Sequence, residues 1–184
     1  MPSSFRKPLP VGLVLLWACE FQPQTAAQTV RAAPLQTYSL RQMTRSAGYI
    51  FAGKVVAVER EAATRPGSVA TVRITFRVEH GIRGVHRGQT LTIREWAGLW
   101  ESGEHYRPGE PVLLFLYPPS KLGLTSTVGG ASGHFAIDGN GQITLAEERI
   151  AALALEPARE AAWRQKGRIS SHQFADATRH MSEE

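Results

Sequence analysis

Two clusters of carboxylate and imidazole side chains have the residue types that bind divalent metals. The first consists of Glu101, Glu104 and His105. The second consists of His172, Asp176 and His180, which a helix would place along one side because they are spaced four apart. Either cluster would make the chain a candidate metal-dependent hydrolase. Neither shows a fourth ligand or a supporting shell, so we expect a solvated loop and a terminal helix instead.

No motif for covalent or cofactor chemistry is present in the sequence. Ser132 lies in the segment GGASG, which lacks the Gly-x-Ser-x-Gly spacing of a nucleophile elbow. The sequence also lacks a Walker loop, a dinucleotide fingerprint and His-Glu-x-x-His. We therefore predict a protein without catalytic residues or a cofactor.

Aromatic and basic residues supply the candidate binding residues. They are Trp96, Trp100, Tyr106 and Arg94. We expect residues 97–109 to form a loop that carries recognition, since binding residues are frequent on loops held by a rigid scaffold. Trp100 is the best candidate because no strand register forces it inward. The alternative is that these aromatics cap the end of a barrel as part of its core.

Hydrophobic periodicity predicts a chain of short strands. Residues 70–78 alternate strictly between apolar and polar side chains, which predicts a strand with one buried face. Residues 112–116 are apolar without a break, and residues 49–59 are apolar on both faces, so both strands should be buried on both faces. Gly53 predicts a bulge or a sharp bend. Further strands are expected at residues 89–96, 122–128, 133–137 and 142–145, the last two forming a hairpin around Asp-Gly-Asn-Gly.

Helices are predicted at both ends of these strands. Ser39 and Gln42 form a capping box that opens a helix over residues 40–47. Helices are also expected at residues 147–155, with Thr144 and Glu147 as a capping box, at 158–166 after Pro157, and at 171–180. The expected fold is α+β and mainly β. It is a five- to seven-stranded antiparallel OB-like barrel with a short N-terminal helix and C-terminal helices.

Four segments in this order resemble bacterial members of the OB-fold superfamily of TIMP-like and netrin-type domains. They are SAGYIFAGKV at 46–55, TFRVE at 75–79 with Gly84, PGE at 108–110 with LLFL at 113–116, and GG at 129–130 before GHF at 133–135. The resemblance implies an exported five-stranded Greek-key barrel. The animal inhibitors use an N-terminal cysteine braced by disulfides. This chain has one cysteine, so the resemblance implies no inhibitory mechanism.

The N-terminus predicts export. Arg6 and Lys7 precede a short apolar stretch, which is typical of a signal peptide or lipoprotein leader over residues 1–27. Cleavage is expected either before Cys19, which would then be lipidated, or near Gln28. Residues 28–36 are interpreted as a linker, residues 37–145 as the barrel domain, and residues 146–184 as a C-terminal helical segment with a tail.

The balance of charge adds little to the choice of function. The formal net charge is +5, but acidic and basic residues are interleaved. Arg73, Arg77 and Arg94 are expected on polar strand positions, where an OB-fold could bind nucleic acid or an anionic polysaccharide. Export argues against nucleic acid. The sequence therefore predicts an exported, non-enzymatic domain that binds a protein or an envelope polymer, and that meets the membrane only through a lipid at Cys19. It would be periplasmic, lipid-anchored or extracellular.

Overall fold

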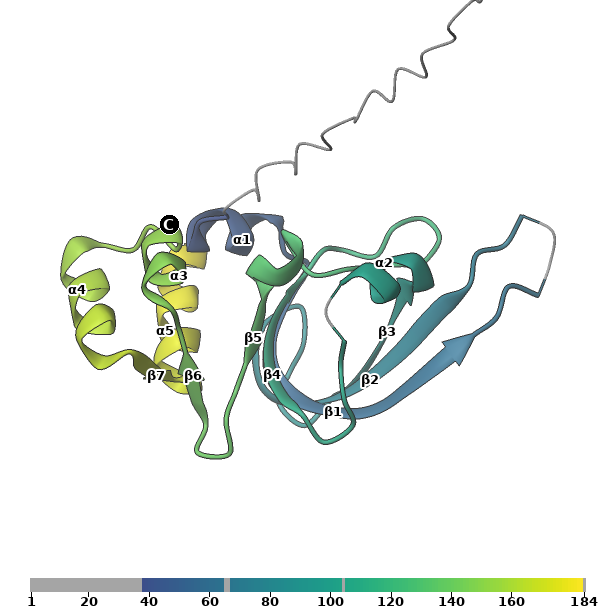
Figure 1. Cartoon of the computed structure of the whole chain (residues 1–184), viewed down its shortest axis with the longest axis horizontal. Helices are drawn as coiled ribbons and strands as arrows, with labels where there is room; N and C mark the ends of the chain where they lie inside the picture. The colour runs from purple at the N-terminus through teal and green to yellow at the C-terminus, as the bar shows by residue number, and fades with distance from the viewer. Residues whose placement is uncertain (1–37, 65–66, 104, 184) are drawn as a thin grey trace, which may run out of the picture. The chain divides into compact units, whose positions relative to one another are not determined.

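The computed structural model of the chain describes residues 38–64, 67–103 and 105–183. Within these residues the fold is α+β, and its main feature is an antiparallel sheet with the strand order β3-β2-β1-β4-β5 (Figure 1). The strands of this sheet are β1 (Tyr49–Glu61), β2 (Thr71–Arg83), β3 (Thr90–Trp96), β4 (Pro111–Leu116) and β5 (His134–Ala136). A separate two-stranded sheet pairs β6 (Gln142–Thr144) with β7 (Arg168–Ser170).

Short helices connect and flank the strands. They are α1 (Leu40–Ser46), α2 (Ala97–Ser102), the 3-10 helix η1 (Gly130–Gly133), α3 (Glu147–Ala152), α4 (Pro157–Lys166) and α5 (Ser171–Glu183). The predicted capping box of α1 is confirmed, because the side chain of Ser39 accepts from the Gln42 N–H and that of Gln42 accepts from the Ser39 N–H. Pro157 begins α4, and Gly167 ends it with a left-handed φ of 63°.

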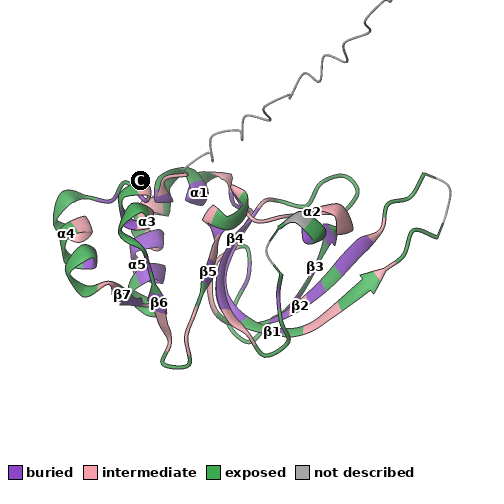
Figure 2. Cartoon of the chain, in the orientation of Figure 1, coloured by how far each residue is buried: buried purple, intermediate pink, exposed green. Residues whose placement is uncertain are grey.

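Strand β4 and residues 50–53 of β1 are buried on both faces, as their apolar sequences predict, whereas Lys54 and Val56 further along β1 are exposed. On one face Phe51 and Leu114 belong to a core enclosed by the curved sheet. On the other face Ile50 and Phe115 belong to a second core that α1 and the C-terminal helices cover. Figure 2 shows the buried residues concentrated in the sheet and on α5. The β1–β4 pair is therefore the wall shared by two hydrophobic cores.

Strand β2 confirms the predicted alternation. Val72, Ile74 and Phe76 are buried, whereas Arg73 and Arg77 are exposed. The pairing of β1 with β2 shifts register at three places, one of them between Ala52 and Gly53, which confirms the predicted bulge. A side chain at position 53 could not be accommodated, because its Cβ would lie 2.5 Å from the Arg77 carbonyl oxygen.

The sheet curves strongly but is not hydrogen-bonded into a closed barrel (Figure 1). Within the described residues its edge strands β3 and β5 do not pair with each other. The segment 124–128 lies between the two sides of the sheet. The Thr125 N–H donates to the Arg94 carbonyl at 2.9 Å, and the Val128 N–H donates to the Phe115 carbonyl at 2.8 Å. This segment, predicted as a strand, forms an isolated bridge between Thr127 and Leu116.

Other predictions near the sheet are wrong in instructive ways. Strand β2 extends beyond the predicted residues 70–78 to Arg83, because its end pairs with the start of β1. The turn at Asp138 forms, since its carboxylate accepts from the N–H groups of Asn140 and Gln142. The strands that flank it do not form a hairpin, because β5 pairs with β4 and β6 pairs with β7.

Corrections also apply to the helices. The N-cap of α3 is Ala146, so the predicted capping box of Thr144 and Glu147 does not form. Strand β7 was not predicted at all. Residues 97–102, predicted as loop, form α2.

The buried face of β2 gives the first testable prediction. Phe76 is fully buried with its ring edge-on to Phe51 and Tyr106, at centroid distances of 5.3 and 5.5 Å. Phe76→Ala should therefore lower the free energy of unfolding by about 3–5 kcal/mol in urea denaturation. The control is Arg77→Ala at the exposed neighbouring position, which should change it by less than about 0.5 kcal/mol. Equal losses at the two positions would contradict this assignment of the strand faces.

Candidate functional site

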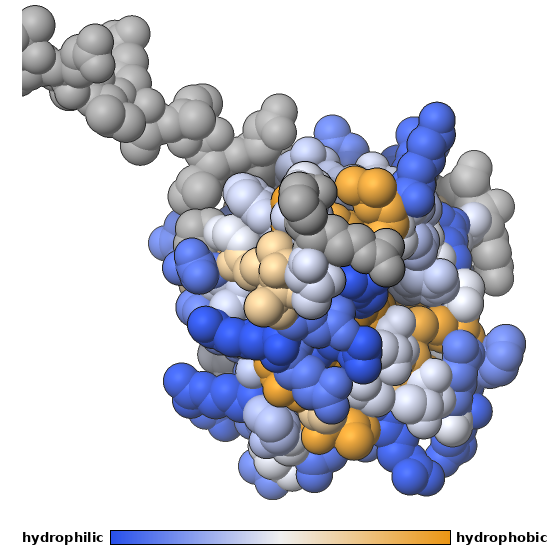
Figure 3. All heavy atoms as spheres, turned by 90° about the vertical axis from the view of Figure 1, so that its right-hand side faces the viewer, coloured by the Kyte–Doolittle hydropathy of each residue, from blue (hydrophilic) through white to orange (hydrophobic). Residues whose placement is uncertain are grey.

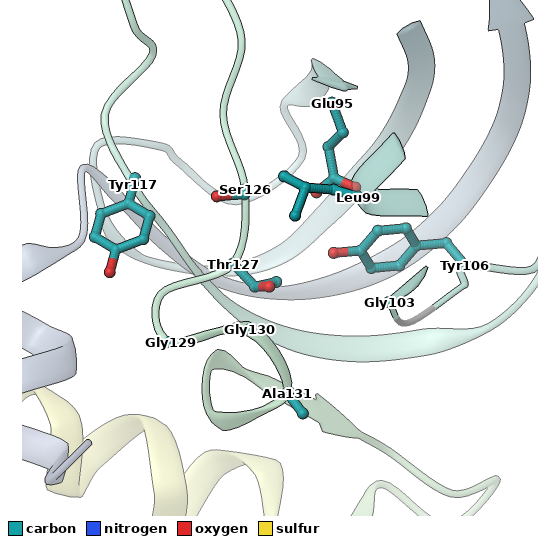
Figure 4. A pocket seen from close by; sticks show the side chains of 10 residues that line it. All are labelled: Glu95, Leu99, Gly103, Tyr106, Tyr117, Ser126, Thr127, Gly129, Gly130 and Ala131. Atoms are coloured by element: carbon teal, nitrogen blue, oxygen red, sulfur yellow. The ribbon is translucent and has the colours of Figure 1, made fainter. Parts of the chain in front are cut away.

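A cavity of about 560 Å³ lies beside the end of β3, between α2 and the loop that leads into η1 (Figure 4). Its polar lining consists of the carboxyl group of Glu95, the phenols of Tyr106 and Tyr117, and the hydroxyls of Ser126 and Thr127. Its remaining lining consists of Leu99, Gly103, Gly129, Gly130 and Ala131. Concave, largely apolar sites with a few convergent polar groups are the usual form of a ligand site.

Glu95 is buried because of its position in the strand. Leu91, Ile93 and Glu95 alternate with outward residues on β3, so the register that buries the first two also turns Glu95 inward. The residue is 6% exposed, and Figure 4 shows its carboxyl group directed into the cavity. No described residue forms a hydrogen bond or ion pair with this carboxyl group, whose oxygens are accessible from the cavity. Burial raises the pKa of Glu95 to about 7.

Tyr106 extends into the cavity from another wall, with its hydroxyl directed inward (Figure 4). Its ring is held by aromatic contacts with Phe76, Trp100 and His134, at centroid distances between 5.4 and 5.8 Å. Burial raises the pKa of Tyr106 strongly, and the charge of Glu95 raises it further. The phenol therefore stays protonated at neutral pH and offers both a donor and an acceptor.

A third wall of the cavity is the glycine turn at Gly129, which contacts Tyr38 and Tyr117. Gly129 has a left-handed φ of 65°, and a Cβ there would lie 2.4 Å from the ring of Tyr38. Burial and a hydrogen bond with the Tyr38 side chain raise the pKa of Tyr117, while a hydrogen bond with the Gly129 backbone opposes this. The close approach of Tyr38 to the backbone requires glycine at position 129.

Arg149 fastens the loop below the cavity. Its guanidinium donates to the carbonyl oxygens of Ala131, Ser132 and His134 at 2.8–2.9 Å, and it lies 4.5 Å from the centre of the Phe135 ring. Burial, assisted by the charge of Arg149, lowers the pKa of His134 to about 4. His134 is therefore neutral at pH 7. Arg149 and His134 shape the site from outside, because neither lines the cavity.

The predicted aromatic residues have three different environments. Trp96 is 49% exposed and lies at the rim. Tyr106 lines the cavity. The expectation that Trp100 lies in a loop with no register to bury it is wrong, because Trp100 is on α2 and is 6% exposed. Its ring packs against Tyr106, so its role is structural.

Arg94 points away from the cavity. Its Nε lies 3.2 Å from the Glu61 carboxylate, on the face of the sheet opposite to Glu95. Arg73 forms ion pairs with the same Glu61 and with Glu59. The predicted basic surface is thus largely neutralised by carboxylates on β1.

The two predicted metal clusters are not assembled as ligand sets. Glu101 and His105 are exposed, His105 lies against the Trp100 ring, and Glu104 is outside the described residues, as is Cys19. In α5, His172 and Arg179 both pair with Asp176, and His180 is exposed. The described part of the chain contains no group of three or more His, Cys, Asp or Glu side chains that could hold a metal ion.

Comparisons with known proteins add no assignment. No family model matches this chain, and no curated protein and no solved structure is significantly similar to it. The resemblance to TIMP-like and netrin-type domains therefore stays a prediction. Among the described residues, no helix has the length and apolar character needed to cross a membrane.

Glu95 is not among the predicted site residues, although the sequence contains a signal for it. The inward positions of its strand are Leu91, Ile93 and Glu95, and a glutamate that continues an apolar alternation must either end the strand or be buried. Buried ionisable groups with shifted pKa values gather at functional sites. A carboxyl group with a pKa near 7 can bind a cation when ionised, or donate a hydrogen bond when protonated.

The burial of Glu95 predicts how stability depends on pH. The folded-state pKa of about 7 lies above the ordinary glutamate value of 4.5, so the folded chain binds more protons than the unfolded chain between these pH values. The free energy of unfolding should therefore fall as the pH rises through this window, by about 3 kcal/mol in total. Glu95→Gln cannot titrate and should lack this fall.

Urea denaturation of the two proteins at several pH values measures the effect. His134, with its lowered pKa, contributes an opposite rise in stability between about pH 4 and 6.5, but this rise is common to both proteins. The difference between wild type and Glu95→Gln isolates the carboxyl group. Parallel stability curves would contradict the burial of Glu95.

Proposed function

We propose that the protein is a non-enzymatic binding domain that takes part of a protein partner or envelope polymer into the Glu95 cavity. The observation that carries this proposal is Glu95 itself. A carboxyl group that is nine-tenths buried and has no partner among the described residues costs folding free energy. A ligand that pairs with this carboxyl group would explain why the chain keeps a destabilising residue at this position.

The rim of the cavity supports a macromolecular ligand. A shallower hollow lined by Trp96, Leu99 and Leu124 adjoins the cavity and shares Leu99 and Tyr117 with it. Trp96 and Leu99 are 49% and 46% exposed. Figure 3 shows apolar patches at the surface among hydrophilic side chains. This arrangement suits a macromolecular partner that places one anchor residue in the polar cavity and makes apolar contacts with the exposed side chains around it.

Titration behaviour favours binding over catalysis. A general acid or base works best with a pKa near the operating pH. Of the titratable side chains described in the cavity lining, the two tyrosines have raised pKa values, which leaves Glu95 near neutrality. A single carboxyl group with a pKa near neutrality, without a second acid or base beside it, supports binding more than acid–base catalysis.

The strand order supports an OB-like barrel, which remains part of the proposal. In the order β3-β2-β1-β4-β5, closure requires β3 to meet β5, and segment 124–128 bridges β3 to β4, the neighbour of β5, through Thr125 and Val128. Partly open five-stranded barrels of this kind carry binding loops. A nucleic-acid role is disfavoured, because Arg73 and Arg94 are paired with carboxylates.

We also propose that the chain is exported, because its leader has the order of a signal peptide. The chain should then begin at Cys19 or near Gln28 when isolated from its native host. Mass spectrometry of the intact protein from membrane and soluble fractions measures this. A start at Met1 in a cytoplasmic fraction would contradict export and return nucleic acid to the candidates.

Filling the cavity should abolish binding without unfolding the chain. Thr127 is half-buried and Figure 4 shows its side chain within the cavity, so Thr127→Phe should place a ring in the binding volume. Peptides selected from a random library on the wild-type chain should bind this variant at least about tenfold more weakly, or about 1.4 kcal/mol. Isothermal titration calorimetry measures the affinities.

Ala151→Phe is the matched control. It adds the same ring at an exposed position of α3 that does not line the cavity, so peptide affinity should be unchanged. If both variants bound as tightly as wild type, or if the library yielded no binder, the cavity would not be the binding site.

A further inference from the structure

We infer that the cavity binds a protonated primary amine, such as the side chain of a lysine, with the Glu95 carboxylate as its counter-ion. This inference rests on the proposed function and names the chemistry of the group that enters the site. The group that enters the cavity is thus a cation, and not a carbonyl, a carboxylate or a purely apolar group.

The charges around the cavity favour a cation. Its described lining holds one carboxyl group, two phenols and two hydroxyls, and no lysine, arginine or histidine side chain. The nearest guanidinium in the sequence, that of Arg94, is directed to the other face of the sheet and pairs with Glu61. The described residues thus leave the charge of Glu95 to be neutralised by a ligand.

The geometry of the cavity fits an ammonium group. An ammonium donates three hydrogen bonds and accepts none. Oxygens on different walls can accept them, since the Glu95 carboxyl and the Tyr106 hydroxyl converge in the cavity and Thr127 lies beside them (Figure 4). The tyrosine rings can add cation–π attraction. Leu99 lies beside the Glu95 carboxyl and offers an apolar contact for the methylene chain of a long cationic side chain.

The pH dependence separates a cation from a hydrogen-bond acceptor. A cation binds the ionised carboxyl group, so its affinity should rise as the pH increases through the pKa of Glu95. A carbonyl ligand would need the protonated form and show the reverse. Other titratable groups lie near Glu95. Tyr106 faces it, and the charge of Glu110 raises the pKa of Tyr106. The ring of His134 lies against Tyr106, and Tyr117 lines the same cavity. The tyrosines stay protonated and His134 stays neutral from about pH 6 to 8, so these groups do not obscure the titration of Glu95.

The test uses the full chain with n-butylamine as the probe and n-butanol as its uncharged counterpart. Titrations followed by NMR or calorimetry should show butylammonium binding to the wild type more tightly than butanol. Its affinity should rise about tenfold from about pH 6 to pH 8, following the ionised fraction of a group with a pKa of about 7. Glu95→Gln should weaken the binding of butylammonium at least about tenfold and remove its pH dependence.

Glu101→Gln is the matched control, because Glu101 is exposed and does not line the cavity. It should bind butylammonium as the wild type does. Circular dichroism checks that Glu95→Gln is folded. If it were not, the pH profile of the wild type and the preference for the amine over butanol would still decide the question.

Three results would overturn the inference. They are equal binding of butanol and butylammonium, undiminished amine binding by Glu95→Gln, and an affinity that falls as the pH rises. In each case, loss of peptide binding in Thr127→Phe would still uphold the proposed function, so the two failures can be told apart. If the amine bound but Thr127→Phe kept its peptide affinity, the amine site would stand and the proposed role in partner binding would fall.

Discussion

The fold depends on one pair of strands, β1 and β4, that is buried on both faces. Neither strand can slip by one residue, because a slip would exchange the side chains that fill the two cores. Ile50 and Phe115 fill the helical side, whereas Phe51 and Leu114 fill the concave side. The bulge at Gly53 lets β1 bend while both faces stay covered. The curvature of the sheet and the docking of the C-terminal helices therefore both follow from this shared wall.

The same curvature produces the candidate site. In the described residues the edge strands β3 and β5 of the curved sheet are not hydrogen-bonded to each other, so other elements cover the opening. Segment 124–128 bonds to β3 and β4, Trp100 of α2 packs against Tyr106, and Arg149 fixes the turn at η1 through three backbone carbonyls. These contacts hold the walls of the cavity, while Glu95 supplies its charge.

The elements that the sequence predicted well are those whose own residues determine them. The capping box of α1 and the alternation of β2 depend on neighbours a few positions away. The elements that were predicted wrongly depend on contacts with residues that are distant in the sequence. Nothing within residues 133–145 reveals that β5 pairs with β4 while β6 pairs with β7. The burial of Trp100 likewise requires Tyr106 and the concave core, which local sequence does not show.

Glu95 marks the point where local pattern and global fold disagree. Its neighbours Leu91 and Ile93 show what the inward face of β3 prefers, and an apolar residue at position 95 would remove the cost of burying a carboxyl group. Arg149, by contrast, offsets its partial burial with three carbonyl acceptors and an aromatic ring. Places where a sequence departs from the preference of its own fold are where functional residues are expected. Glu95 is such a place, because it points into a cavity and no hydrogen bond or ion pair from the described residues compensates it.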